Sequence, residues 1–151
     1  MKKFIFLFVM VLSTSCASTT SFNTFYQNHE DDSNFSFGLS SSLIANFLPD
    51  EDLEDLKPLL KKAKHIRILV FSDNAEDKSQ KFDKFISRSK FEEMVKLRSE
   101  NDKLAFFTLT RKDRIKEIVL EISSGDDLVL VGLKTNLTQK DLDNLISSQQ
   151  T

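Results

Sequence analysis

The chain has 151 residues, of which 21 are Lys or Arg and 23 are Asp or Glu, for a formal net charge of −2. This balance argues against a nucleic-acid-binding protein, because such proteins usually carry a strongly basic surface. Fourteen phenylalanines stand against one tyrosine and no tryptophan. Sugar-binding sites favour Trp and Tyr, whose polar tips also reach water, so this aromatic content indicates core filling or an apolar groove.

The first sixteen residues read as a leader. Lys2 and Lys3 precede nine apolar residues, Phe4 to Leu12, and Ser13-Thr14-Ser15-Cys16 follows. A basic start, a short apolar run and small residues before a cleavage point are typical of a secretory signal peptide. An apolar run must reach about 20 residues to cross a bilayer. We therefore expect residues 1–15 to be a signal peptide and not a membrane-spanning helix.

Cys16 is the only cysteine of the chain. Its place after Ser15 resembles the lipobox of bacterial lipoproteins, in which the cysteine is acylated and becomes the new N-terminus. The lipobox prefers Leu at the third position before the cysteine, where this chain has Ser13. A lone thiol, which has no partner for a disulfide within the chain, also favours a capped cysteine. The alternative is an ordinary signal peptide that is cleaved near Ser15 or Ala17, with Cys16 incidental.

Lipidation at Cys16 predicts attachment to a membrane through the N-terminal lipid, and therefore a place in the cell envelope. The residues that follow Cys16 are Ser- and Thr-rich and not acidic, which favours an anchor in the outer membrane that faces the periplasm. Residues 16–24 are then the lipidated N-terminus and a tether. Residues 25–151 are long enough for one domain and hardly for two.

The first half of the domain mixes helical and strand-like periodicity. We expect a helix over 22–29 with Phe22, Phe25 and Tyr26 on one face, and then a strand over 34–39 with Phe35, Phe37 and Leu39 inward. Two helices should follow over 43–48 and 50–63, with a break near Pro58. A central strand over 65–71 then leads to a helix over 75–89 with Phe82, Phe85 and Ile86 inward.

Four strand-like runs fill most of the second half. They cover residues 91–98, 103–110, 114–122 and 127–134, and short polar linkers join them. Short linkers favour antiparallel neighbours, so we expect a meander. A capping box at Thr138-Gln139-Lys140-Asp141 then opens a last helix with Leu142, Leu145 and Ile146. The predicted fold class is α+β, an antiparallel sheet of about 5–6 strands with helices packed mainly on one face.

From about Phe22 onward, this order of elements resembles the DUF4252 family of Bacteroidetes. The resemblance rests on patterns of apolar residues in His65 to Phe71, in Phe91 to Leu97 with the strands that follow to Ile122, and in Leu128 to Leu133 with Asp141 to Leu145. It implies the fold of small, often lipidated envelope proteins of unknown function. It implies no catalytic, cofactor-binding or metal-binding residues.

The sequence contains no motif that predicts a catalytic, cofactor-binding or metal-binding site. An acylated Cys16 is not a nucleophile, and three glycines in the whole chain form no phosphate-cradling loop. His29 and His65 lie in different elements, without the spacing of a metal site. The acidic run at 50–55 resembles a calcium loop but lacks the glycine at position 6, and Lys61 stands where the loop needs Glu. An acidic helix start is the simpler interpretation.

Three groups of charged residues allow a functional interpretation beside the structural one. Glu92 with Glu93, and Glu117 with Glu121, could present carboxylates for acid–base work across neighbouring strands, although an outward charged face of the sheet is the simpler interpretation. The basic hairpin tip at residues 111–114 could contact lipid headgroups or an acidic partner. A solvated turn that protects the sheet edge is the simpler interpretation there.

The leading hypothesis is a non-enzymatic, lipid-anchored envelope protein whose sheet acts as a binding or protein-interaction module. Another envelope protein is the candidate partner, and nucleic acid is not expected. The alternative is a carrier or sensor of a small apolar ligand in a Phe-lined groove, suggested by the phenylalanine excess. The packing of Phe35, Phe37, Phe106 and Phe107 separates the two: an open cavity favours the carrier, and full packing removes it.

Overall fold

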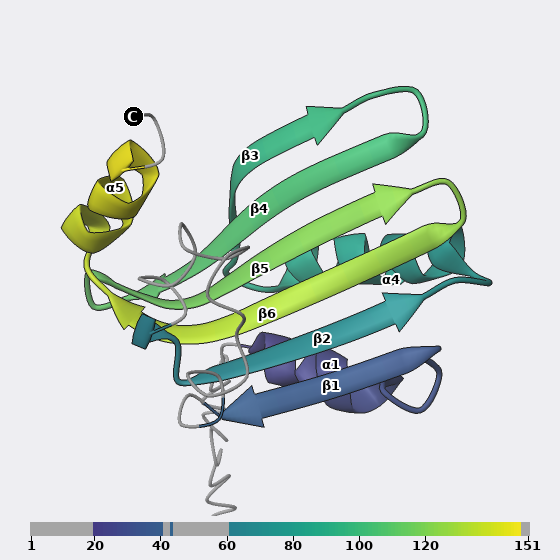
Figure 1. Ribbon diagram of the computed structural model, residues 1–151, viewed down its shortest axis with the longest axis horizontal. Helices are drawn as coiled ribbons and strands as arrows, with labels where there is room; N and C mark the ends of the chain where they lie inside the picture. The colour runs from purple at the N-terminus through teal and green to yellow at the C-terminus, as the bar shows by residue number, and fades with distance from the viewer. Residues whose placement is uncertain (1–19, 41–42, 44–60, 149–151) are drawn as a thin grey trace, which may run out of the picture.

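The computed structural model describes residues 20–40, 43 and 61–148. It shows one open sheet with helices beside it (Figure 1). The elements in chain order are α1 (Phe22–His29), β1 (Phe35–Ser40), β2 (His65–Phe71), α4 (Ala75–Arg88), β3 (Glu92–Arg98), β4 (Asp102–Arg111), β5 (Arg114–Ser124), β6 (Asp127–Leu137) and α5 (Gln139–Ser148).

The sheet has six strands in the order β1-β2-β6-β5-β4-β3, and every neighbouring pair is antiparallel. Strands β3 to β6 follow one another in space as in the chain, so the predicted meander is confirmed. Strand β2 pairs with β6 on one side and with β1 on the other. Its apolar character on both faces fits this interior position. The predicted α+β class is also confirmed.

Helices α1 and α4 cover one face of the sheet, called the inner face below (Figure 1). Three- and four-residue spacing places the apolar side chains of each helix on one side. Phe82 of α4 is fully buried, and its ring stands edge-on to Phe25 of α1 at 5.4 Å and to Phe107 of β4 at 5.7 Å between centroids. Such edge-to-face pairs stabilise a core by about 0.5–1.5 kcal/mol beyond the burial of their area.

The opposite face, called the outer face below, holds a second apolar cluster. Ile66, Ile118 and Leu133 are buried there together with Ala63, which precedes β2, and Leu142 of α5. Helix α5 lies at the end of the sheet where β6 finishes (Figure 1). The predicted capping box holds it: the backbone N–H of residue 138 donates to the Asp141 carboxylate at 2.9 Å, and the Asp141 N–H donates to the hydroxyl of residue 138 at 3.1 Å.

The hairpins explain how the meander turns. Gly125, between β5 and β6, has φ of 57°, a left-handed conformation that glycine adopts without steric strain. Lys112 and Asp113, between β4 and β5, have φ of 51° and 60°. Two consecutive positive φ values are typical of a two-residue hairpin turn whose twist matches that of the strands. This turn places the basic tip between the ends of β4 and β5.

One expectation about the first strand is wrong. Strand β1 forms as predicted, but Phe35 and Phe37 are 55% and 39% exposed and do not point inward. Their partners in β2 are Val70 and Ile68, which belong to the outer face. Leu39 is the one of the three that packs on the outer-face cluster.

The two helices predicted over 43–48 and 50–63 lie largely outside the described residues. Within that stretch, Leu43 is helical and exposed, and the helical pair Lys61–Lys62 leads into buried Ala63.

Candidate functional site

Cys16, the one residue assigned a function from the sequence, lies outside the described residues, as do the signal peptide and residues 17–19 of the predicted tether. The described chain starts at Thr20, four residues after Cys16, and Ser21 caps helix α1. Over the residues that the structure describes, no helix is long and apolar enough to cross a membrane.

The two histidines are not brought together around one site. His29 stacks on Phe25 at 4.1 Å between ring centroids, and its Nδ1 lies 2.9 Å from the Phe25 carbonyl oxygen. His65 is exposed at the start of β2. Within the described part of the chain, no three His, Cys, Asp or Glu side chains are placed to hold a metal ion. The acidic run at 50–55 lies outside that part.

The expectation that Glu117 and Glu121 decorate an outward charged face is wrong. Both lie on the inner face, beneath the helices. Glu121 is fully buried and faces Lys103 of β4, whose Nζ lies 2.9 Å from each of its two carboxylate oxygens. Only Oε1 satisfies hydrogen-bond geometry with Lys103, and it also accepts from the Ser79 hydroxyl at 2.9 Å.

The Lys103 ammonium has a second acidic neighbour, Asp83 of α4, at 3.1 Å. Burial by itself lowers the pKa of Lys103, but the hydrogen bonds and charges of Glu121 and Asp83 outweigh it and raise that pKa. The Lys103 ammonium therefore stays charged, and its contacts with Asp83 and Glu121 join α4 to the sheet. These contacts between α4 and the sheet point to a structural role for the pair. Glu92 and Glu93 are exposed on β3, and Glu93 pairs with Lys96 at 3.2 Å.

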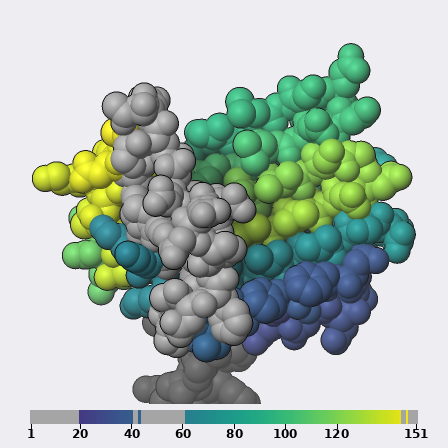
Figure 2. Space-filling view, viewed as in Figure 1, coloured from purple at the N-terminus to yellow at the C-terminus, as the bar shows by residue number. Residues whose placement is uncertain are grey.

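The outer face is apolar over most of the sheet. Because side chains alternate along a strand, the register assigns this face to Phe35, Phe37, Leu39, Ile66, Ile68, Val70, Val129, Val131, Leu133, Ile118, Leu120, Ile122, Leu104, Phe106, Val95 and Leu97. Its polar members are Thr108 and, towards the strand ends, Glu92, Asp102, Ser124 and Asp127. On the right of Figure 2, the strands follow one another as adjacent bands in the sheet order, from β1 at one edge through β2, β6, β5 and β4 to β3 at the other. Leu97 is 59% exposed, Val95 48% and Leu104 37%.

The four phenylalanines that separate the two functional hypotheses behave differently. Phe107 is buried against α4, and Phe106 packs partly on the outer-face cluster. Phe35 and Phe37 stack on each other at 6.1 Å between centroids and remain exposed at the β1 edge. Among the described residues, neither full packing nor one cavity shared by these phenylalanines is found. A shallow groove of about 510 Å³ has Leu97, Leu104 and Ile122 as its apolar lining, and its other lining residues are polar or charged: Arg98, Ser99, Asp102, Lys103, Ser123 and Ser124.

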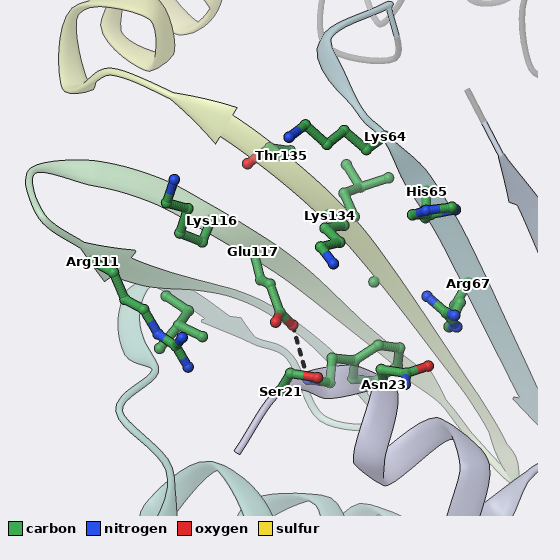
Figure 3. A pocket seen from close by; sticks show the side chains of 14 residues that line it. Ser21, Asn23, Lys64, His65, Arg67, Arg111, Lys116, Glu117, Lys134 and Thr135 are labelled. Atoms are coloured by element: carbon green, nitrogen blue, oxygen red, sulfur yellow. Dashed lines mark hydrogen bonds between the residues drawn. The ribbon is translucent and has the colours of Figure 1, made fainter. Parts of the chain in front are cut away.

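A second cavity, called the basic pocket below, opens where helix α1 begins. It has a volume of about 530 Å³. Figure 3 shows side chains that approach it from β2, β5 and β6, above the first turn of α1. Its lining residues are Ser21, Phe22, Asn23, Lys64, His65, Arg67, Leu109, Arg111, Lys116, Glu117, Gly132, Leu133, Lys134 and Thr135.

The floor of the basic pocket is formed by a close approach of α1 to the sheet. The Phe22 ring covers Gly132 of β6 so closely that a Cβ at Gly132 would lie 2.0 Å from the ring. The Phe22 N–H donates to Glu117 Oε2 at 2.8 Å. Burial raises the pKa of Glu117, while this hydrogen bond and the charges of Lys134, Arg111 and Arg67 oppose the rise.

Sequence reasoning identified part of this pocket. It noted Arg111 as a basic hairpin tip, and the structure places Arg111 in the pocket wall. It missed Lys64, Arg67 and Lys134, which come from distant parts of the chain. A signal was present: Arg67 and Lys134 occupy inner-face positions of their strands, where an apolar residue is expected if a helix covers them. Charge at those positions indicates that the helical layer ends there.

The comparisons with known proteins add a family and no described function. No curated protein and no solved structure matches the chain. A family model described as "Domain of unknown function (DUF4252)" matches residues 26–145, from α1 to α5. Because the match covers most of the chain, the protein belongs to the DUF4252 family.

Proposed function

We propose that the protein is a lipid-anchored, non-enzymatic protein of the cell envelope, whose domain binds another envelope protein. The anchor is Cys16, and the supporting features are the basic start, the short apolar run and the small residues that precede the cysteine. The Ser- and Thr-rich tether favours the outer membrane, with the domain in the periplasm. A folded domain that begins within a few residues of Cys16 fits attachment close to a membrane surface.

One observation carries the proposal of an interaction module: the apolar outer face remains partly open. Soluble monomeric proteins rarely expose large contiguous apolar patches, and such patches mark interaction sites. Phe35 and Leu97, at opposite edges of the sheet, are both more than half exposed. Burying a fully exposed side chain of this kind contributes about 1.5–3 kcal/mol, so covering one that is a little more than half exposed contributes roughly half as much. A partner that covers several of them would therefore gain enough to bind specifically.

The chemistry of the outer face defines the partner. Thr108 and Asp102, which is bonded to Ser124 at one end of the face, are its polar contributions from strands β4 and β5. Its acidic side chains lie towards the strand ends, where Glu92 is opposite Thr108 and Asp102 and Asp127 flank Ser124. The apolar part between them is matched by another apolar surface, because a charged group placed there would lose hydration without gaining an ion pair. The partner we propose is another envelope protein with an apolar face.

A second candidate function has its own observation. The groove of about 510 Å³ lined by Leu97, Leu104 and Ile122 has the size of a small-ligand site. It supports a carrier or sensor of a small apolar ligand. Native mass spectrometry of the purified protein tests this candidate: a bound molecule that is lost in Leu104→Asp and kept in Lys96→Gln would favour it over the protein partner.

The anchor is tested in cells that are grown with radiolabelled palmitate. Wild-type protein should take up the label, and Cys16→Ala should not, because the acylated thiol is removed. Ser18→Ala changes the same stretch without removing the thiol and should be labelled like wild type. Label that persists in Cys16→Ala would refute anchoring at this residue.

The interaction surface is tested by photo-crosslinking in the membrane-anchored protein. A photoreactive residue at position 35 or 97 should form an adduct with the same envelope protein, whereas one at Lys96, on the other side of β3, should not. The purified partner should then bind the wild-type domain and Lys96→Gln but not Leu97→Asp. Adducts with a second copy of this chain, or with residues 41–60 of the same chain, would assign the face to those occupants and contradict the proposal.

A further inference from the structure

We propose that the basic pocket at the start of helix α1 binds a phosphate group carried by a small molecule or a lipid headgroup. Five cationic side chains line it: Lys64, Arg67, Arg111, Lys116 and Lys134. This inference goes beyond the proposed partner binding, since the pocket lies on the helix side of the sheet and the apolar face on the other.

The negative charge inside the pocket is already engaged. Among the described lining residues Glu117 is the one acid, and its carboxylate accepts the N–H of Phe22 at 2.8 Å. Even with Arg111 left out of the count, the cations Lys64, Lys134, Arg67 and Lys116 outnumber this carboxylate in a partly enclosed space. Such a space concentrates field lines and favours an anion.

The cations of the pocket differ from the structural cations of the same domain. Lys103, Lys78 and Lys62 each pair with an aspartate or glutamate within 3.1 Å. Among the described residues, neither Lys64 nor Lys134 forms an ion pair, although both line the pocket. The domain therefore pairs the lysines that hold its helices and leaves these two for another anion.

Two of the pocket cations are held in place by neighbours that do not neutralise them. The Arg67 guanidinium lies over the Tyr26 ring, at 5.6 Å from its centroid. The Lys116 ammonium donates to the side-chain oxygen of Asn136. A cation–π contact and a neutral acceptor orient a cation while its charge remains available. Positioned donors of this kind reduce the ordering cost of binding.

The first turn of α1 adds uncharged donors and an unused polar group. Ser21, Phe22 and Asn23 all line the pocket, and the start of a helix carries a partial positive charge. The buried side-chain oxygen of Asn23 has no hydrogen-bond partner among the described residues. Turning that amide by 180° would present its NH₂ group, which is a donor to an anion.

Phosphate is the anion that fits this arrangement best. Arg guanidinium groups bind phosphate through paired hydrogen bonds, and Lys supplies point charges around it. A volume of about 530 Å³ holds a phosphate with the group that bears it. From Cys16, five residues lead to Ser21, a span of at most about 18 Å. The inference that the phosphate belongs to a lipid headgroup rests on the proposed anchor, whereas the inference that the pocket binds phosphate does not.

The test uses the mature chain from residue 16 with Cys16→Ser, so its outcome is independent of acylation. Inorganic phosphate, titrated at constant ionic strength, and sedimentation with vesicles of phosphatidylglycerol or phosphatidylcholine are the two probes. The pocket variant Lys64→Gln/Lys134→Gln should weaken binding about tenfold or more, because two charge-assisted contacts are removed. The matched variant Lys90→Gln/Lys140→Gln removes the same charge from exposed lysines outside the pocket and should bind like wild type.

The two probes separate the two sources. Pocket-dependent binding of inorganic phosphate, without enrichment on phosphatidylglycerol vesicles, assigns a soluble phosphate compound. Pocket-dependent binding to phosphatidylglycerol and not to phosphatidylcholine assigns a headgroup. The proposal is overturned if neither probe binds, or if the pocket variant and the matched variant lose binding equally. Circular dichroism melts of both variants, which change exposed lysines, verify that each is folded.

Discussion

The Phe22 ring rests on the backbone of Gly132, and no side chain other than hydrogen fits between them. A Cβ built at Gly132 would lie 2.0 Å from Cδ1 and 2.4 Å from Cε1 of the ring. Phe22 is itself 3% exposed and opens helix α1. The close contact therefore fixes where α1 meets β6, and with it the floor of the basic pocket.

Replacing this glycine should destabilise the domain. In Gly132→Ala the new methyl group must displace the buried Phe22 ring, at a cost of about 1–3 kcal/mol typical of overpacking. Urea unfolding measures the change. Gly38→Ala is the matched control, because a Cβ there meets its nearest atoms at 3.8–3.9 Å, which is ordinary contact. Equal losses in the two variants would show that Gly132 is not required by the Phe22 ring.

The Lys103–Glu121 pair should be costly to break from one side. Lys103→Met leaves the fully buried Glu121 carboxylate without its cation, and removal of one partner of a buried pair costs about 3–5 kcal/mol. The double variant Lys103→Met/Glu121→Leu removes both charges and should recover much of this loss. A double-mutant cycle from urea unfolding measures the coupling, and additive effects would contradict a direct pair.

Buried and exposed phenylalanines should differ in how much their replacement by alanine lowers the free energy of unfolding in urea. Phe107→Ala opens a cavity beneath Phe82 and should cost about 3–5 kcal/mol. Phe35→Ala removes a side chain that is 55% exposed and should change the unfolding free energy by less than about 1 kcal/mol. A large loss in Phe35→Ala would mean that this residue is covered in solution.

The Asp141 carboxylate, which caps α5, should make the stability of the domain depend on pH. The Lys62 ammonium, followed by the N–H and hydroxyl of Thr138, holds the pKa of Asp141 far below its ordinary value of 3.8. A lowered pKa gives stability that is present above the unfolded pKa and is lost as pH falls towards the folded one. The difference in stability between wild type and Asp141→Asn should therefore shrink as pH decreases below about 4. Urea unfolding of the two proteins at several pH values measures this difference, and a difference that stays constant as pH decreases would contradict the role of the Asp141 carboxylate.

Glu117 should act in the opposite direction. Burial raises its pKa above the ordinary value of 4.5, against the Phe22 N–H and nearby cations. A raised acid pKa means that the folded state holds the proton more tightly, so its contribution to stability falls as pH rises from 4.5 through the folded pKa. Glu117→Gln removes this titration. The stability of wild type relative to the variant should decline with rising pH in that window, as urea unfolding at several pH values measures.

The order of helices and strands could be read from local patterns, but the side on which the helices pack could not. Alternation in β1 separates Phe35 and Phe37 from their neighbours, and alternation in β5 separates Ile118 from Glu117. It does not say which set is covered, because both faces of this sheet are largely apolar and only tertiary packing distinguishes them. The capping box at α5 was predictable since its partners lie three residues apart.

The basic pocket shows a second limit of prediction from local sequence patterns. Its cations come from β2, from the β4–β5 hairpin and from β6, and the register of three strand pairs brings them together. Arg111 was visible in the sequence as part of a charged tip, whereas Lys64 follows Lys61 and Lys62 in a basic run before β2 and Lys134 stands near the end of β6. Nothing local distinguishes such lysines from solvated ones, so the pocket became visible only with the sheet order.

If the proposed anchor at Cys16 holds the protein by its N-terminus, the position of helix α1 has a mechanical consequence. Strands β1 and β2 join the meander through one line of pairing, β2 with β6, and α1 lies across that line. Its first residue contacts β6 through Gly132 and β5 through Glu117, while Tyr26, one turn later, contacts Arg67 of β2. A pull on the tether would load the Phe22–Glu117 hydrogen bond first, before any strand is drawn apart. The helix next to the tether therefore bears the tension and keeps the sheet closed.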